Sequence, residues 1–362
     1  MARVANFTAG PAALPLPVLE EAQRDLCDYQ GTGMSIMENS HRSKTYEAVH
    51  NEAIALTKEL LGVPDGYQVL FIQGGASHQF AMIPLNFLPA GRSADYIITG
   101  HWSERAFDEA QLVGKARIAG TSKPSGFMRI PRASELELDP QAAYVHMTTN
   151  NTIYGTEWFE EPATSGVPLL ADMSSDFLSR RIDVKKYAMI YAGAQKNLGP
   201  SGVLVAIMRQ ELIDAGRKDI PSIFRYTTYA KNNSLFNTPP TFAIYLCRGV
   251  LRWIKSQGGV DQIQAVNVDK AARLYGAIDA APDYYKCPVD PAARSRMNVV
   301  WRLPSETLED KFVKEAEKAG LVGLKGHRSV GGIRASIYNA VSVADVQKLC
   351  DFMGEFRSKN PG

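Results

Sequence analysis

The sequence has few features of a disulfide-bonded, zinc-binding or membrane protein. It contains only four cysteines and no CxxC pair, which excludes the common zinc and dithiol redox motifs. Reduced thiols in a cytoplasmic enzyme are the expected interpretation. No apolar run reaches the ~18 residues of a membrane span, and the N-terminal stretch MARVANFTAGPAALPLP has no apolar signal-peptide core. We therefore expect a cytoplasmic protein that is not attached to a membrane.

The chain also lacks a large excess of charge of either sign. Its formal net charge is +2, with 40 Lys and Arg residues against 38 Asp and Glu residues. Without a dominant basic block, general nucleic-acid binding is not expected. The charged fraction of 22% and the hydrophobic fraction of 45% are those of a globular protein. A chain of 362 residues is long enough for about two domains.

Apolar runs that end in small or polar residues alternate with helical patterns through the first two thirds of the chain. This alternation predicts an α/β fold with a mostly parallel sheet and helices on both faces. The expected strands are residues 67–72, 94–99, 143–149, 168–173 and 188–193, and the expected helices are residues 78–88 and 103–112. Ligands on such sheets bind beyond the carboxyl ends of the strands. The loops expected at that edge are residues 73–77, 100–103, 149–155, 172–176 and 193–199.

After about Gly258 the pattern changes to one long helix followed by strand, helix, strand and helix. Ser305 is placed to cap the first of the later helices, and Ser342 with Asp345 resembles a capping box for the second. This order predicts a small α+β domain. The expected parts are an N-terminal segment associated with the small domain and the active site, a large ligand-binding domain and a small C-terminal domain, at residues 1–15, 16–258 and 259–362.

The loop QGGAS, from Gln73 to Ser77, places two glycines between a strand and a helix. Glycines allow close approach of the backbone to a ligand, and a helix start offers free N–H groups to an anion. The loop is thus a candidate phosphate site, although it matches neither GxxxxGK[ST] nor GxGxxG. An ordinary tight turn between strand and helix is the alternative.

A single lysine, Lys196, lies in the small-residue loop YAGAQKNLGPSG between two apolar runs. Its amine is either a solvated surface charge or a nucleophile held near a pocket. Asp172 ends an apolar strand, where its carboxylate can pair with a protonated heterocyclic nitrogen or cap the following turn. Trp102 follows another strand, where its indole can stack on a flat ring or pack in the core.

Together these loops offer a phosphate cup, an aromatic plate, a carboxylate and an amine. Pyridoxal phosphate uses all four, because a lysine binds its aldehyde covalently and an aspartate holds the proton on its ring nitrogen. The amine of Lys196 follows Asp172 by 24 residues. The order of phosphate loop, tryptophan, aspartate and lysine is more specific than any single member, and it predicts a pyridoxal-phosphate enzyme.

Distinctive stretches are spread along the whole chain: NFTAGPAALP, SHRSKTYE, FIQGGAS, GHWSERAF, ADMSSDFLSR, GAQKNLGPSG, NTPPTFAIY and GHRSVGGIRASIYNA. With these stretches the chain resembles the phosphoserine aminotransferases, a family of fold-type I pyridoxal-phosphate enzymes. The resemblance implies that Lys196 is the catalytic lysine bound to the cofactor's aldehyde, that Asp172 pairs with the ring nitrogen and that Trp102 stacks on the ring. Thr152 would reach the ring hydroxyl, although Asn151 stands beside it where the family pattern has glutamate.

The resemblance also implies a shared phosphate site. Ala76 and Ser77 would bind the cofactor phosphate with help from Gln195, and Ser77 stands where some members carry arginine. Asn237 and Thr238 would reach the phosphate in the partner subunit's site. The stretch that carries them has two prolines, which favour a rigid projecting loop over a strand. The implied active unit is therefore a homodimer with shared active sites.

Five cations are candidates for binding the substrate. Arginine holds planar carboxylates with two hydrogen bonds and stays charged. The resemblance implies that Arg334 holds the α-carboxylate and that His41, Arg42, His327 and Arg328 surround a substrate phosphate. The alternative is that all five are solvated surface charges.

The activity implied by the resemblance is transfer of an amino group from L-glutamate to 3-phosphohydroxypyruvate. It gives O-phospho-L-serine and 2-oxoglutarate, and bacterial relatives also use 4-phosphooxy-threonine of vitamin B6 synthesis. Alternatives are an alanine–glyoxylate aminotransferase, a cysteine desulfurase and a non-catalytic pyridoxal-phosphate-binding protein. Cys287 lies in no recognisable desulfurase motif, and glyoxylate has no use for a second anion site. Neither a metal site nor a nucleic-acid partner is expected.

Overall fold

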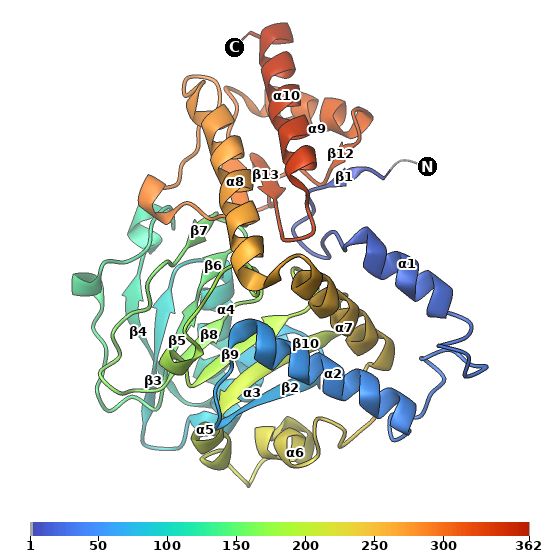
Figure 1. Cartoon of the computed structure of the whole chain (residues 1–362). Coiled ribbons are helices and arrows are strands. Elements are labelled where there is room, and N and C mark those ends of the chain that lie inside the picture. Colours follow the sequence, from blue (N-terminus) through green and yellow to red (C-terminus); the bar gives the residue numbers. More distant parts are fainter. Residues whose placement is uncertain (1–2, 362) are drawn as a thin grey trace.

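A seven-stranded sheet forms the centre of the molecule, which the computed structural model describes over residues 3–361 (Figure 1). The strands, in spatial order, are β2 (Tyr67–Gln73), β10 (Val203–Arg209), β9 (Met189–Gly193), β8 (Leu169–Asp172), β5 (Val145–Thr148), β3 (Ser93–Ile98) and β4 (Lys115–Thr121). Strand β10 runs antiparallel to both of its neighbours, and the other neighbouring pairs of this sheet are parallel. The predicted α/β fold with a mostly parallel sheet is confirmed.

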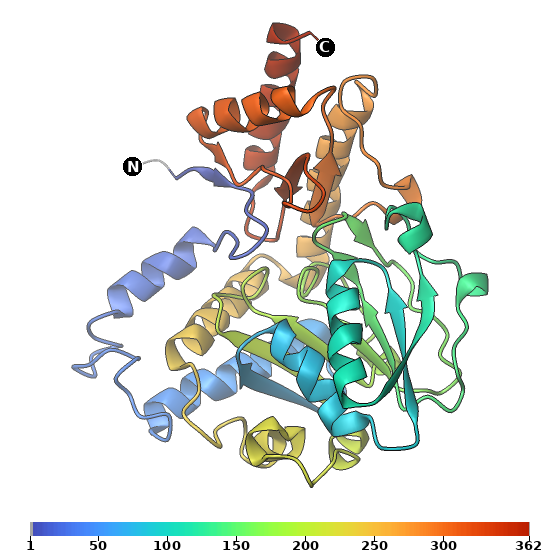
Figure 2. The same ribbon diagram turned by 180° about the vertical axis from the view of Figure 1, so that it is seen from behind.

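Helices cover both faces of the sheet. The helices of this part are α1 (Leu16–Asp25), α2 (Lys44–Leu61), α3 (Ala76–Phe87), α4 (His101–Val113), α5 (Gln210–Asp214), α6 (Tyr226–Lys231) and α7 (Thr241–Ser256). Helices α2 and α7 lie on one face (Figure 1), and α3 and α4 lie on the other (Figure 2). Alternate residues of β2 enter different cores, Val69 and Phe71 beside α2 and α7, Leu70 and Ile72 beside α3 and α4. Burial on both faces explains why such strands are continuous apolar runs.

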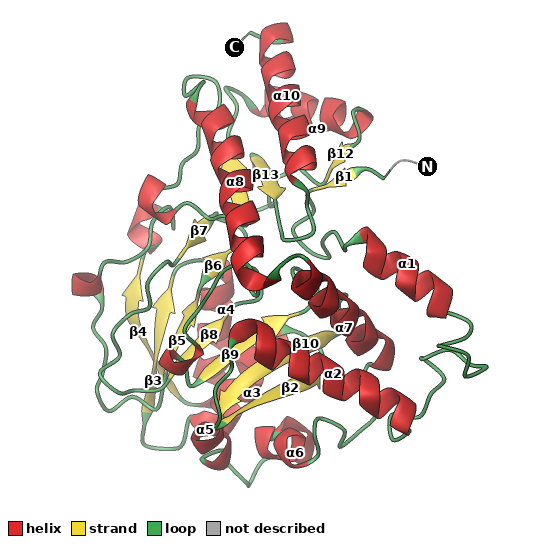
Figure 3. Cartoon of the chain, in the orientation of Figure 1, coloured by secondary structure: helices red, strands yellow, loops and turns green. Residues whose placement is uncertain are grey.

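The C-terminal part packs helices around short strands (Figure 3). Its elements are α8 (Gly259–Asp279), β11 (Asn298–Trp301), α9 (Glu306–Lys318), β12 (Leu321–Val322), β13 (Ile333–Ser336) and α10 (Val343–Lys359). Ser305 caps α9, and Ser342 and Asp345 form the reciprocal capping box of α10, as predicted. These side chains satisfy amide groups that a helix start leaves without a partner.

The beginning of the chain joins this C-terminal part. Strand β1 (Ala5–Asn6) pairs in parallel with β12, and Phe7 is buried in the same core as Trp301 and Phe312. A small hairpin, β6 (Asn150–Asn151) with β7 (Thr156–Glu157), follows β5. The predicted domain boundaries stay predictions, and residues 1–2 and 362 of those ranges lie outside the described residues.

None of the described helices combines the length and the apolar character needed to cross a membrane. Within residues 3–361, no group of three or more His, Cys, Asp or Glu side chains is arranged to hold a metal ion.

Candidate active site

A cavity of about 590 Å³ lies where the loops at the carboxyl edge of the sheet meet. Each of the five predicted loops contributes to its lining. The lining residues of these loops include Gly74, Gly75, Ala76, Ser77, Trp102, Thr152, Ile153, Asp172, Ser174, Ser175, Gln195 and Lys196. His327 and Arg334 line it from the C-terminal part, and residues 9–11 line it from the N-terminal segment. The volume falls in the usual range of small-molecule sites.

Lys196 lies in the loop that joins β9 to β10, and its Nζ donates a hydrogen bond of 2.5 Å to Oγ1 of Thr152. Burial lowers the pKa of this amine to about 8, although the negative charge of Asp172 opposes the shift. A surface lysine would not experience this desolvation. Lys196 is therefore a partly neutral amine held in a cavity, and the solvated-charge alternative does not describe it.

The small residues around Lys196 also have a packing reason. A Cβ atom at Gly199 would lie 2.7 Å from Sγ of Cys247 in α7. Helix α7 therefore approaches the loop so closely that only glycine fits at this position. Close packing of the loop on α7 holds the backbone next to Lys196 in place.

Asp172 is the last residue of β8, and only 4% of it is exposed. Its Oδ1 accepts hydrogen bonds from Ser174, 2.9 Å from the backbone N and 2.6 Å from Oγ. Burial raises the pKa of Asp172, while these two bonds and the positive charge of Lys196 oppose that shift. Oδ1 therefore caps the turn, as one of the two sequence interpretations predicted, and pairing of Oδ2 with a protonated ring nitrogen stays a prediction. Ser174 was missed, although an aspartate side chain commonly accepts a hydrogen bond from the backbone two residues further along the chain.

The predicted phosphate cup is the start of helix α3. Gly75 is its N-cap, Ala76 is its first residue, and Gly74 has a φ of +101° that only glycine adopts readily. Free N–H groups at the start of a 12-residue helix favour an anion. Trp102 lies in the first turn of α4, is half-buried, and its Nε1 is buried without a hydrogen-bond partner in the described residues.

Arg334 and His327 lie together at one end of the cavity. Nη1 of Arg334 donates a hydrogen bond of 3.1 Å to the carbonyl of Thr152, and its buried Nε has no partner among the described residues. Burial lowers the pKa of His327, and the neighbouring charges of Arg334, His101 and Arg328 lower it further. His101 was not predicted; it lies at the first position of α4. This end of the cavity therefore offers the positive charge of Arg334 and the hydrogen-bonding imidazole of His327 to an anionic substrate.

Other predicted residues are not brought into this cavity by their own chain. His41, Arg42, Asn237, Thr238 and Arg328 are absent from its lining. Arg42 is exposed before α2, and Nδ2 of Asn237 donates to Oε1 of Gln73 at 2.9 Å. One chain alone therefore brings together the predicted cofactor residues except Asn237 and Thr238, and only part of the predicted substrate half.

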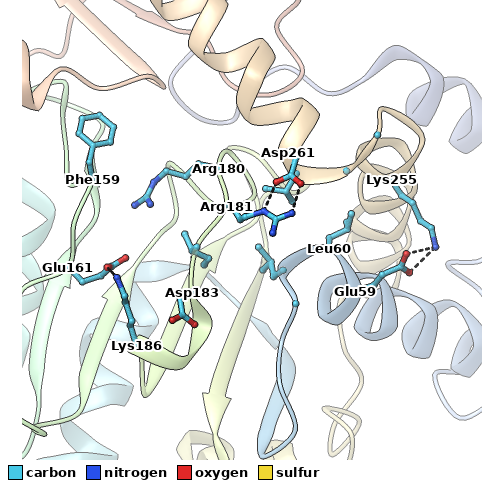
Figure 4. Close-up of a pocket in the computed structure, with 16 residues that line it drawn as sticks. Glu59, Leu60, Phe159, Glu161, Arg180, Arg181, Asp183, Lys186, Lys255 and Asp261 are labelled. Carbon is cyan, nitrogen blue, oxygen red and sulfur yellow. Dashed lines mark hydrogen bonds and ion pairs between the residues drawn. The ribbon is translucent and has the colours of Figure 1, made fainter.

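A larger open groove of about 1050 Å³ lies elsewhere and shares no lining residue with the cavity (Figure 4). Its charged side chains largely neutralise one another. The ion pairs along it are Arg181–Asp261, Lys255–Glu59 and Lys186–Glu161. The groove therefore has little unpaired charge with which to select a charged ligand.

The groups that line the cavity match the chemical groups of pyridoxal phosphate. The helix start of α3 suits the phosphate, the indole of Trp102 suits a flat ring, and Asp172 and Lys196 suit the ring nitrogen and the aldehyde. The unpartnered Nε1 and Nε atoms of Trp102 and Arg334 mark places where a ligand would complete hydrogen bonding. Fold and site together define a pyridoxal-phosphate-dependent transferase.

Comparisons with known proteins agree with this class. The aminotransferase class-V family matches residues 4–349. The phosphoserine aminotransferase of Herpetosiphon aurantiacus is 54% identical over 356 residues, which cover 98% of this chain and 99% of that protein. A solved phosphoserine aminotransferase from Bacillus circulans subsp. alkalophilus has a TM-score of 0.97 at 54% identity, with 99% of each chain covered. A pyridoxal-phosphate-bound phosphoserine aminotransferase from Trichomonas vaginalis has a TM-score of 0.93 at 38% identity, with 97% of this chain and 100% of that chain covered. The chain belongs to the class-V aminotransferase family, and within it to the phosphoserine aminotransferases. Its cofactor is pyridoxal phosphate.

Proposed function

We propose that the enzyme transfers the amino group of L-glutamate to 3-phosphohydroxypyruvate in serine biosynthesis, giving 2-oxoglutarate and O-phospho-L-serine. The observation that carries this proposal is the end of the cavity where the guanidinium of Arg334 and the imidazole of His327 lie together, and Arg328 follows His327 in the chain. A substrate with both a carboxylate and a phosphate needs two anion sites, whereas glyoxylate needs one. The 4-phosphooxy-threonine of vitamin B6 synthesis carries the same two anions and is the second substrate to test.

Lys196 is the proposed acid–base residue. Bound pyridoxal phosphate supplies an electron sink for the electron pair left at the substrate's α-carbon. With a pKa of about 8, a useful fraction of the Lys196 amine is neutral near neutral pH and can accept the α-proton. The hydrogen bond to Thr152 fixes the position of Nζ, which accepts the α-proton from the substrate and later returns it.

The other cavity residues are proposed to hold the substrate and the cofactor and to polarise the cofactor ring. Asp172 presents a negative charge to the ring nitrogen, and the bonds from Ser174 fix its orientation. Arg334 holds the α-carboxylate that both substrates share, and Trp102 orients the ring from one face. Asp172 is almost fully buried, which strengthens its charge interactions.

We further propose a cytoplasmic homodimer in which each cavity is completed by the partner subunit. Large apolar side chains are exposed in the segment before α2 and in the loop before α7, namely Leu26, Met34, Met37 and Phe236. Exposed apolar groups in one region favour burial against another chain. His41, Arg42, Asn237 and Thr238 belong to the same two segments, so a two-fold axis there would place them at the partner's cavity.

A cysteine desulfurase is not supported by the state of Cys287. The side chain is partly buried, and burial raises the pKa of its thiol. A thiol with a raised pKa is a poor nucleophile near neutral pH. The transaminase proposal does not need this residue.

An amino-acceptor panel tests the proposed substrate. L-glutamate is the donor, and 3-phosphohydroxypyruvate, glyoxylate and pyruvate are compared by kcat/KM. We expect 3-phosphohydroxypyruvate to be used best by far. A preference for glyoxylate or pyruvate would reject the second anion site.

A further inference from the structure

Lys270 is a fully buried lysine whose ammonium binds three main-chain carbonyls. It lies in α8, and 0% of it is exposed. Its Nζ donates to the carbonyl oxygens of Ile337, Tyr338 and Val341 at 2.8, 2.7 and 3.0 Å. Burial lowers the pKa of Lys270 to about 7, whereas the negative charge of Asp345 opposes that shift. Only the protonated form has three N–H donors, so three carbonyl acceptors require the ammonium.

The residues that Lys270 holds, 337–341, form a loop between β13 and α10 that we call the clamp loop. The clamp loop reaches the residue next to the catalytic lysine. The backbone N–H of Asn339 donates to Oδ1 of Asn197 at 3.0 Å, and Asn197 directly follows Lys196. Asn267, one turn before Lys270 in α8, donates to Oδ1 of Asn339 at 2.8 Å. Two side chains of α8 therefore hold the clamp loop against the loop of Lys196.

The clamp loop also begins directly after the strand that carries Arg334. Arg334 lies in β13, which ends at Ser336. The hydroxyl of Tyr338 donates to the carbonyl of Ala9 at 2.8 Å, and Ala9 lines the cavity. One short segment thus connects Arg334, the N-terminal wall of the cavity and the lysine loop. A shift of this segment would change the distance between Arg334 and Lys196.

We propose that Lys270 is a positioning residue of the active site, which fixes the clamp loop and thereby the place of the substrate carboxylate relative to Lys196. This proposal rests on the proposed role of Arg334 in holding that carboxylate. Reacting atoms must be aligned to within about an ångström, and a 1 Å displacement caused far from the chemistry can cost ~100-fold in rate. An ordinary structural lysine would affect stability without affecting this alignment.

The test uses the cofactor-bound enzyme and L-glutamate alone, followed in single turnovers by the cofactor's absorbance. In Lys270→Met the chain length and burial are kept and the donors are lost. We expect the rate constant to fall ~10- to 100-fold and the glutamate concentration for half-maximal rate to rise. Leu274→Ala is the matched control, because Leu274 is fully buried in the same helix and shares the apolar core of Ile337 and Val341 but makes no hydrogen bond to the clamp loop. We expect it to lower Tm and leave the glutamate reaction unchanged.

A double variant tests the route through Asn197. If Lys270 acts through Asn339 and Asn197, Lys270→Met with Asn197→Ala should lose less than the sum of the two single losses in free energy. Additive losses would overturn this route. The positioning role would be overturned if Lys270→Met reacted with glutamate as fast as the wild type, or if Leu274→Ala were slowed as much as Lys270→Met. If Lys270→Met does not fold, Lys270→Gln, which keeps two donors, takes its place. Because no acceptor is used, a wild type that reacts with glutamate but rejects 3-phosphohydroxypyruvate would disprove only the proposed substrate.

Discussion

Lys196 and Thr152 are joined by a hydrogen bond of 2.5 Å between Nζ and Oγ1. The main-chain carbonyl of the same threonine accepts from Arg334 at 3.1 Å. Thr152 therefore contacts both the amine that we propose moves a proton and the arginine that we propose holds the substrate. The proposed chemistry therefore depends on the position of Thr152.

Replacing Lys196 by alanine should abolish transamination and leave a folded protein that still binds pyridoxal phosphate without a covalent bond. Borohydride reduction of the wild type should attach the cofactor to a peptide that contains Lys196. Lys186→Ala is the control, because Lys186 is exposed and paired with Glu161; its activity should be normal. Label on any other lysine would refute the assignment.

The pKa of Lys196 should be visible in the cofactor-free enzyme. It is lowered by burial from 10.5 to about 8, so the neutral, nucleophilic amine increases as pH rises through 8. The rate at which this enzyme captures pyridoxal phosphate should therefore rise with pH and level off above about 8. Stopped-flow absorbance measures this rate, and Lys196→Ala provides the background. A rate that keeps rising to the pKa of a free lysine would contradict the desolvated site.

Asp172→Asn should lower the activity and, at neutral pH, raise the thermal stability. Loss of the charge that keeps the ring nitrogen protonated should lower kcat by ~100-fold or more. Because burial raises the pKa of Asp172 above its ordinary value of 3.8, the folded state binds this proton more tightly than the unfolded chain does. That stabilisation is present at low pH and is lost as pH rises through the folded-state pKa.

At neutral pH the ionised Asp172 therefore costs stability, and cofactor-free Asp172→Asn should have a higher Tm than the wild type. The difference should vanish below about pH 4, where both side chains are neutral. Thermal scans at both pH values measure it. Near-normal turnover would show that Asp172 only caps its turn.

Arg42 and Arg334 should differ in which substrate they affect. Arg42→Ala should weaken 3-phosphohydroxypyruvate far more than L-glutamate, because only the former has a phosphate. Arg334→Ala should weaken both, because both have an α-carboxylate. Removing one charged partner from a shielded site costs about 2–5 kcal/mol. Steady-state kcat/KM values for both substrates give the comparison, and equal losses in the Arg42 variant would exclude its phosphate role.

Mixed dimers should recover activity if the loop before α7 crosses to the partner. One parent carries Lys196→Ala, and the other carries Asn237→Ala with Thr238→Ala. After subunit exchange, half of the dimers are mixed and half of their sites are complete, so about a quarter of wild-type activity should return. Mass spectrometry confirms the exchange. Activity that stays at the parental level after exchange would mean that the loop serves only its own chain.

Much of the fold, and the grouping of most cofactor candidates in one cavity, could be predicted because distinctive residues follow the apolar runs that form the strands. Asp172 ends an apolar run, Lys196 interrupts a small-residue loop and Trp102 follows a strand, so topology alone brings their loops together. The helix caps at Ser305 and Ser342 could also be predicted from the sequence, because capping depends on residues only three positions apart.

The remaining features depend on distant contacts. Lys270 looks like one more charged residue of a surface helix in the sequence. It is buried because the carbonyls that it binds lie 67 to 71 residues later in the chain. His41 and Arg42 carry a motif signal, but the folded chain leaves them away from its own cavity. Their proposed place depends on a second subunit, whose position cannot be predicted from a local sequence pattern.

The pairing of Ala5 with Leu321 has a consequence for how the enzyme is made. Residues 9–11, which line the cavity, are translated long before β12, the strand that anchors their neighbours. The large sheet can form during synthesis, because domains generally fold as units from the N-terminus onward. A nascent chain can thus have a folded sheet while its catalytic centre still lacks one wall. Activity begins only when β12 has been made and has paired with β1.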